Sequence, residues 1–168
     1  MLSQTMQDAI NDQITWELYS GYIYLSMSAY FEDQGLPGVA KWMHAQYQEE
    51  VFHAMKMFGY VAEAGGRVKL GAIDAPPHDW ESPLAAFEQA LEHERGVTKR
   101  INDLVNMAVE EKDHATQIFL QWFVSEQVEE ESTVGDVVSK LKLVGDGGAL
   151  FMLDRDLGTR VFTEPADA

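Results

Sequence analysis

The stretch that decides the fold covers residues 39–64 and reads VAKWMHAQYQEEVFHAMKMFGYVAEA. Its apolar residues recur at alternating spacings of four and three, which is typical of a helix that packs one stripe against a bundle core. At that spacing the stripe consists of Val39, Met43, Gln46, Glu50, His53, Met57, Tyr60 and Ala64. The apolar run is therefore interrupted near its middle by a carboxylate and an imidazole.

Three further segments show the same periodicity, and helix breakers separate them. The first helix is expected to begin after Ser3 or Thr5, and the third at Ser82, followed by Pro83 at the first helical position. Residues 67–82 contain one glycine and two prolines, and are too long for a hairpin loop, so they predict a long crossover between the second and third helices. The chain is therefore predicted to be one all-α domain, residues 1–168, with a four-helix bundle at about 4–144, a short fifth helix at about 147–158 and a flexible tail at 159–168.

Polar interruptions recur in the stripes of the other three long helices. The first stripe contains Glu17, the third contains Glu94, and the fourth contains Gln127 and Glu130. The interval of 33 residues between Glu17 and Glu50 is repeated between Glu94 and Gln127. This repeat predicts two related helix pairs around a pseudo-twofold axis, with all the interruptions at one level of the core.

The charge of this level points to metal. Four of the interruptions are carboxylates, and the stripes hold no Lys or Arg to neutralise them: Glu17, Glu50, Glu94 and Glu130. A buried, unpaired carboxylate costs several kcal/mol, so these groups either take up protons or bind cations, and two divalent cations match their charge. Oxygen ligands with one imidazole favour iron or manganese. Because only residues 50–53 form a Glu-x-x-His motif on a stripe, the second metal position is expected to be more open or weaker than the first.

The overall composition excludes several functions. The 168 residues include 12 Lys and Arg against 28 Asp and Glu, a formal net charge of −16, which argues against nucleic acid and anionic membranes as partners. There is no cysteine, so a disulfide framework and a cysteine nucleophile are excluded. The longest uncharged run, Leu18–Phe31, has 14 residues, whereas a membrane span needs roughly 20. With no signal-peptide pattern at the N-terminus, a cytoplasmic protein is expected.

Other candidate ligands have simpler interpretations. The second Glu-x-x-His, at residues 111–114, falls on a turn and is expected at the solvated surface. Three histidines lie off the stripes and are also expected at the surface: His44, His78 and His93. Tyr24 lies two turns beyond Glu17 on the same face. It is either an ordinary core aromatic residue or a group that donates hydrogen bonds or electrons near the metals.

Five phrases of the sequence carry a family resemblance. They are ELYSGYIYLS at 17–26, QEEVFHAMK at 48–56, GGRV at 65–68, FEQALEHE at 87–94 and QWFVSEQVEE at 121–130. Through them nearly the whole chain resembles the ferritin family, and specifically the prokaryotic non-haem ferritins. The resemblance implies a ferritin-like bundle that oxidises Fe²⁺ with O₂ or H₂O₂ at a di-iron centre within each subunit. It also implies a homo-oligomeric cage, usually of 24 subunits, that stores ferric oxyhydroxide mineral.

The resemblance also implies roles for individual residues. The first iron would be held by Glu17, Glu50 and His53, and the second by Glu50, Glu94 and Glu130, with Gln127 beside it. The ligands are then also the catalytic residues, with Tyr24 next to them, because the metals carry the chemistry. A third iron site would use Glu49, Glu126 and Glu129, with Glu130 adjoining it. No haem is expected, because the residue after Glu50 is Val51 rather than the methionine of bacterioferritins.

The sequence also predicts an oligomer, and it leaves one alternative function. Four apolar residues of the predicted fifth helix need a hydrophobic partner, which favours an oligomer: Leu150, Phe151, Leu153 and Leu157. The alternative function is a small di-iron carboxylate oxidoreductase, an erythrin-like peroxide scavenger that works as a dimer without storage.

Overall fold

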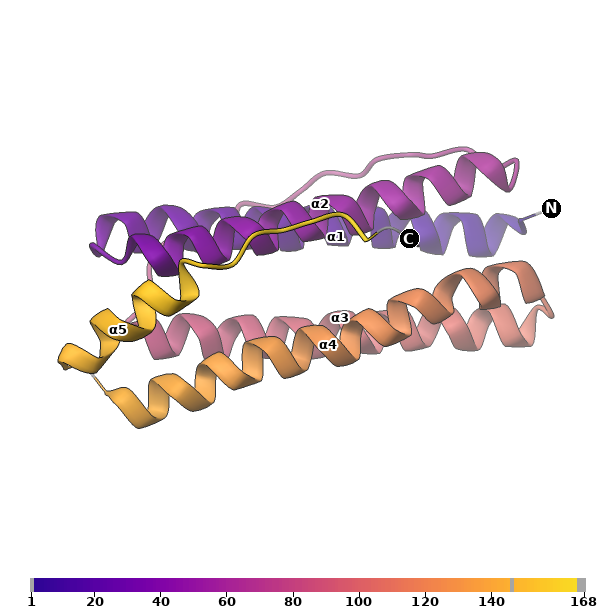
Figure 1. The fold of residues 1–168 in the computed structure, drawn as a ribbon. Coiled ribbons are helices and arrows are strands. Elements are labelled where there is room, and N and C mark those ends of the chain that lie inside the picture. Colours follow the sequence, from indigo (N-terminus) through magenta and orange to yellow (C-terminus); the bar gives the residue numbers. More distant parts are fainter. Residues whose placement is uncertain (1, 146, 166–168) are drawn as a thin grey trace.

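Two helical hairpins stacked on each other form the body of the computed structural model, which describes residues 2–145 and 147–165 (Figure 1). The five helices are α1 (Gln4–Asp33), α2 (Pro37–Glu63), α3 (Pro83–Glu110), α4 (His114–Val144) and α5 (Gly148–Leu157). The first hairpin is α1 with α2 and the second is α3 with α4. This is the predicted all-α bundle with a long crossover and a short fifth helix.

Side-chain caps begin the helices at the predicted places. The Ser3 hydroxyl accepts a hydrogen bond from the backbone N–H of Met6 at 3.0 Å, so Ser3 rather than Thr5 starts α1. The Ser82 hydroxyl accepts from the N–H of Ala85 at 3.1 Å, one residue before the proline that opens α3. Each cap satisfies a backbone donor that the first helical turn leaves free.

The crossover between α2 and α3 runs along α1 and is held there by side chains of that helix (Figure 1). The Asn11 amide donates to the carbonyl of Arg67 at 3.0 Å. Further along, the Tyr30 hydroxyl donates to the carbonyl of Trp80 at 2.9 Å. The long connection is therefore part of the packed structure, and it carries the chain the length of the bundle so that α3 can pair with α4.

The core consists of two apolar clusters with a polar layer between them. One cluster gathers around Tyr24, Phe31 and Phe87 towards the α5 end, and the other around Ile10 and Phe123 towards the opposite end. The buried polar side chains between the clusters include Glu17, Gln46, Glu50, His53, Glu94, Gln127 and Glu130. The predicted level of polar interruptions is thus a single layer at the middle of the bundle.

Helix α5 packs on its own subunit more than its sequence suggests. Leu153 and Leu157 are buried in the cluster around Phe31, so their hydrophobic partner is the bundle itself. The need for a hydrophobic partner is thus met within the bundle for these two, so they do not argue for an oligomer, while Phe151 remains 73% exposed. The carboxylate of Asp154 also accepts a hydrogen bond from the N–H of Val39 at 2.8 Å, which ties α5 to the first turn of α2.

The C-terminal segment turns back along α2 after α5 ends (Figure 1). The guanidinium of Arg160 donates to a carboxylate oxygen of Glu49 at 2.7 Å and lies 4.6 Å from the ring centre of Trp42. The ring of Phe162 lies 6.0 Å from that of Phe52. Arg160 and Phe162 of the predicted flexible tail therefore contact α2, and residues 166–168 lie outside the described part of the chain.

One histidine prediction was wrong. His44 and His78 are exposed as expected, but His93 is half-buried between α3 and α1. Its Nε2 lies 2.7 Å from the Ser20 hydroxyl and its ring stacks on Trp16 at 5.8 Å. Burial lowers the pKa of His93 from 6.5 to about 4, so the ring is neutral at physiological pH.

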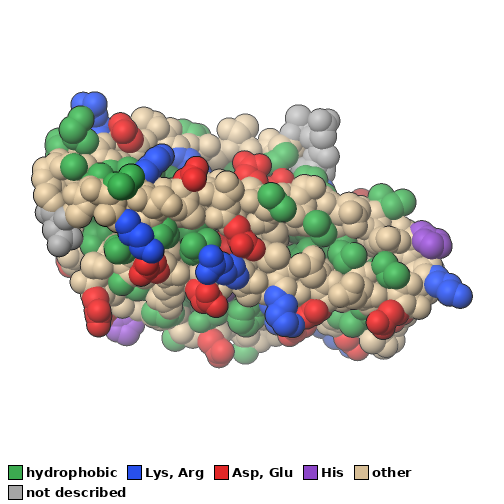
Figure 2. Space-filling view, turned by 90° about the horizontal axis from the view of Figure 1, so that it is seen from below, with side chains coloured by type: hydrophobic (Ala, Val, Ile, Leu, Met, Phe, Trp, Pro, Cys, Tyr) green, Lys and Arg blue, Asp and Glu red, His purple; other side chains and the backbone are tan. Residues whose placement is uncertain are grey.

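The face seen from the α3 and α4 side carries acidic and basic side chains interspersed with apolar ones (Figure 2). Among the described residues, no helix combines the length and the apolar character that crossing a membrane requires.

Candidate metal centre

The polar layer receives side chains from all four long helices. Glu17 comes from α1, Glu50 and His53 from α2, Glu94 from α3, and Gln127 with Glu130 from α4; each is at most 3% exposed. The predicted site residues therefore do meet, because the alternating spacing of four and three aims each of them at the bundle axis.

Three of these side chains form a group with the dimensions of a metal site. Glu17, Glu50 and His53 each offer one ligand atom, and these atoms lie within 4.8 Å of one another. The Nδ1 atom of His53 is 3.7 Å from Oε2 of Glu50. Oε2 of Glu17 and Oε2 of Glu50 are buried without a hydrogen-bond partner among the described residues. Such orphaned carboxylate oxygens are costly in a protein interior unless a cation satisfies them, so the donor set fits a divalent metal ion.

The carboxylates of the second hairpin are held by hydrogen bonds. Glu94 accepts one from the Tyr24 hydroxyl and another from the Gln127 amide, at 3.3 Å. Glu130 accepts one from the Gln46 amide at 2.8 Å. Of the two roles considered for Tyr24, hydrogen bonding beside the centre is the one observed; electron supply stays a prediction.

Burial sets the protonation of these carboxylates. It raises the pKa of Glu94 to about 7, although the hydrogen bonds from Tyr24 and Gln127 act in the opposite direction. Burial, together with the negative charges of Glu94 and Glu49, raises the pKa of Glu130 to about 8. The pKa of Glu50 is also raised well above its usual value, first by burial and then by the neighbouring carboxylates. The metal-free centre therefore holds protons near neutral pH, and a bound cation has to displace them.

A second group of possible ligands lies beside the first and shares His53 with it. Glu49, His53 and Glu126 each offer one atom within 4.8 Å of the others. Nε2 of His53, which has no hydrogen-bond partner among the described residues, is 4.0 Å from Oε2 of Glu126. The structure thus brings together two of the acids expected for a third site, whereas Glu129 is exposed and belongs to neither group.

Three residues that contact the carboxylates of the centre were not predicted from the sequence as part of the site. Gln46 occupies a stripe position, so its spacing alone marked it as a neighbour of the site. Arg160 lies outside every periodic segment, and its ion pair with Glu49 has no local signal. Gln13, which donates a hydrogen bond to Glu17 at 2.9 Å, sits four residues before it on α1 and just off the stripe.

Comparisons with known proteins agree with this geometry. The family model of the ferritin-like domain matches residues 7–144. A curated bacterial non-heme ferritin from Bacteroides fragilis is 49% identical over 160 residues, covering 95% of this chain and all of its own. Another, from Staphylococcus aureus, is 37% identical over 98% of this chain and 99% of its own.

Solved structures show the same likeness in three dimensions. An open-pore ferritin from the hyperthermophilic archaeon Archaeoglobus fulgidus superposes with a TM-score of 0.95 at 56% identity, covering 96% of this chain and all of the other. A humanised archaeal ferritin superposes with a TM-score of 0.96 at 55% identity, covering 97% of this chain and 99% of the other. With matches over nearly its whole length, the chain belongs to the ferritin family.

Proposed function

We propose that the protein stores iron and has ferroxidase activity. It would oxidise Fe²⁺ with O₂ or H₂O₂ at the buried centre and keep the product as ferric oxyhydroxide inside a homo-oligomeric cage of 24 subunits. The observation that carries this proposal is the buried group of Glu17, Glu50 and His53, with its two unpartnered carboxylate oxygens. The names of the relatives, non-heme ferritins, support iron as the bound metal, and the proposal includes no haem.

Fe²⁺ is the substrate of this reaction. Glu17, Glu50 and His53 would bind the first ion, and Glu50 would share the second with Glu94 and Glu130. Two Fe²⁺ ions give up one electron each, and one O₂ accepts both. Negative carboxylate ligands stabilise Fe³⁺ more than Fe²⁺, so they favour the oxidation. Gln127, which donates a hydrogen bond to Glu94, would orient that ligand.

Loading the centre would release protons. At pH 7 Glu130, with a pKa of about 8, is largely protonated in the metal-free state, and Glu94, with a pKa of about 7, is about half protonated. Both must ionise to bind a cation. Anaerobic Fe²⁺ binding in weakly buffered solution is therefore expected to acidify the medium before any oxidation occurs.

A third Fe²⁺ would bind beside the centre, at Glu49 and Glu126, with Glu129 and Glu130 nearby. Support for this comes from the second group of ligand atoms, in which Nε2 of His53 lies next to Glu126. His53 would then bind the first ion through Nδ1, and its protonated Nε2 would face Glu126 of the third position, because a neutral imidazole has only one nitrogen lone pair.

Cage formation has support at the end of the bundle near α5. Leu143, Phe151 and Met152 are exposed by 86%, 73% and 63%. Large apolar side chains this exposed, at the end of α4 and on α5, are typical of a surface that another subunit covers.

The chain offers a matched control for testing the oxidation. The variant Glu50→Ala/His53→Ala should lose rapid aerobic Fe²⁺ oxidation, followed by the absorbance of Fe³⁺. The control Glu111→Ala/His114→Ala removes the same motif from the exposed junction between α3 and α4 and should oxidise Fe²⁺ like the parent protein. Unchanged oxidation by the first variant would refute the assignment of the centre.

Storage is tested by size and by mineral. A cage of 24 chains of 18.9 kDa each has a mass of about 450 kDa, whereas the erythrin-like alternative predicts a dimer of about 40 kDa. Size-exclusion chromatography with mass detection separates the two. Electron microscopy after aerobic iron loading should show mineral inside the particles.

A further inference from the structure

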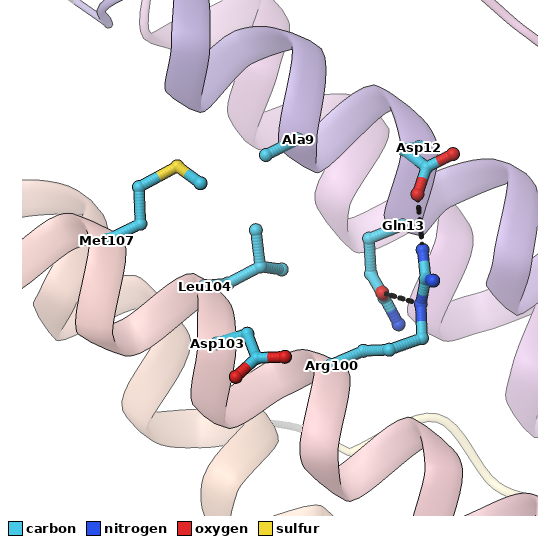
Figure 3. A pocket seen from close by; sticks show the side chains of 7 residues that line it. All are labelled: Ala9, Asp12, Gln13, Arg100, Asp103, Leu104 and Met107. Atoms are coloured by element: carbon cyan, nitrogen blue, oxygen red, sulfur yellow. Dashed lines mark hydrogen bonds and ion pairs between the residues drawn. The ribbon is translucent and has the colours of Figure 1, made fainter.

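A hydrogen-bonded pair connects the metal centre to the surface between α1 and α3. Gln13 on α1 is 1% exposed, and its Nε2 donates to Oε1 of Glu17 at 2.9 Å. The carbonyl oxygen of the same amide accepts a hydrogen bond from Nε of Arg100 on α3 at 2.8 Å (Figure 3). The pair lines a pocket of about 180 Å³ whose other walls include Ala9, Leu104 and Met107.

Arg100 is itself fixed from two further directions. Its guanidinium pairs with the carboxylate of Asp12 (Figure 3) and lies 4.5 Å from the ring centre of Trp16. A guanidinium is always charged and has only donors to offer. The oxygen of the Gln13 amide must therefore face Arg100, and its NH₂ group must face Glu17.

This fixed orientation decides which oxygen of Glu17 is available. Oε1 is occupied by the Gln13 hydrogen bond, and Oε2 is the atom left without a partner among the described residues. Without Arg100, the Gln13 amide could rotate and present its oxygen to the carboxylate, which would repel it. The cation also polarises the amide and strengthens its N–H as a donor.

We propose that Gln13 and Arg100 are positioning residues that hold Glu17 as a ligand through a single oxygen, aimed at the first cation of the centre. The inference rests on the proposed function, because it assigns Glu17 to a metal. Neither residue touches the metal, and both act through the carboxylate. Removing a hydrogen-bond partner of a metal ligand typically weakens metal binding by about 10- to 100-fold.

The test uses Co²⁺ under anaerobic conditions as a spectroscopic probe of the first site. Gln13→Met removes both hydrogen bonds with little change in volume, and Arg100→Met removes only the outer one. Arg95→Met is the matched control, since Arg95 lies on the same helix but its side chain is 58% exposed and pairs with surface acids. In Gln13→Met and Arg100→Met we expect Co²⁺ to bind at least about 10-fold more weakly, with an altered visible absorption spectrum. Arg95→Met should keep the affinity and the spectrum of the parent protein.

The outcomes separate this inference from the proposed function. The proposed function fails if the parent protein binds no Co²⁺, or if its Co²⁺ binding survives in Glu50→Ala/His53→Ala. If the parent binds but Gln13→Met and Arg100→Met share its affinity and spectrum, only the positioning role is refuted. A purely structural effect would lower the melting temperature of the metal-free protein and leave the Co²⁺ spectrum unchanged, which also refutes the role. Should Gln13→Met not fold, the partly exposed Arg100→Met decides the question by itself.

Discussion

Replacing Glu130 by glutamine is expected to stabilise the metal-free protein near neutral and at alkaline pH, and to have little effect at acidic pH. Burial and the nearby carboxylates raise the pKa of Glu130 from 4.5 to about 8. A group whose pKa is raised by folding contributes stability below its ordinary pKa and loses that contribution as the pH rises towards the folded value. Glutamine has the same shape, can still accept the hydrogen bond from Gln46, and never ionises.

The size of the effect follows from the pKa difference. Each pH unit between the two pKa values corresponds to about 1.4 kcal/mol of unfolding free energy. The advantage of Glu130→Gln over the parent is therefore less than about 1 kcal/mol at pH 5, about 3 kcal/mol at pH 7 and about 5 kcal/mol above pH 8. Divalent cations should reverse the sign, because they stabilise the carboxylate and not the amide.

Urea unfolding of chelator-treated protein at pH 5, 7 and 8.5 measures this dependence. The control is Glu129→Gln, an exposed neighbour on the same helix, which should change stability by less than about 0.5 kcal/mol at each pH. A difference between Glu130→Gln and the parent that is the same at all three pH values would refute the reasoning, since it would then not come from ionisation.

Three further predictions follow from single contacts. Arg160→Ala frees the carboxylate of Glu49 from its 2.7 Å ion pair, so Zn²⁺ titration by calorimetry should show several-fold tighter binding at the group of Glu49, His53 and Glu126; unchanged affinity would mean that the pair does not compete with cations. Tyr24→Phe removes the hydrogen bond that lowers the pKa of Glu94. Glu94 should then ionise at higher pH, so the pH midpoint of Co²⁺ binding should move upward; an unmoved midpoint would contradict this. In Gly38→Ala the new methyl carbon would lie 1.8 Å from the carbonyl oxygen of Asp154, so α5 must shift; trypsin should cut the C-terminal region faster than in the parent, and equal rates would show that the contact yields easily.

The helices and the polar layer were predictable because both depend on short-range periodicity. A stripe with spacings of four and three settles which side chains of one helix share a face, as with Glu50 and His53. Once that face is known to be buried, the cost of placing carboxylates in it leaves protons or cations as the only partners. The structure adds that the layer suits both partners: burial raises the pKa values of Glu94 and Glu130, which favours protons, and one oxygen of Glu17 has no hydrogen-bond partner among the described residues, which suits a cation.

Contacts away from the stripes could not be predicted in this way. His93 sits one residue before Glu94, just off the stripe, and is covered by α1 because the two hairpins press together there. The buried faces of Leu153 and Leu157 depend on how α5 turns back onto the start of α2. In each case the residues that meet are far apart in sequence and share no common period.

By itself, therefore, the amino-acid sequence determined the helical bundle, its long crossover and the layer of carboxylates that calls for cations, since periodicity and the cost of buried charge are local properties of the chain. Only the tertiary structure decided which oxygen of Glu17 is free, that Arg100 reaches this ligand through Gln13, and that Arg160 pairs with Glu49. These details depend on distances between side chains that lie up to 111 residues apart, and packing of the complete chain is what sets them.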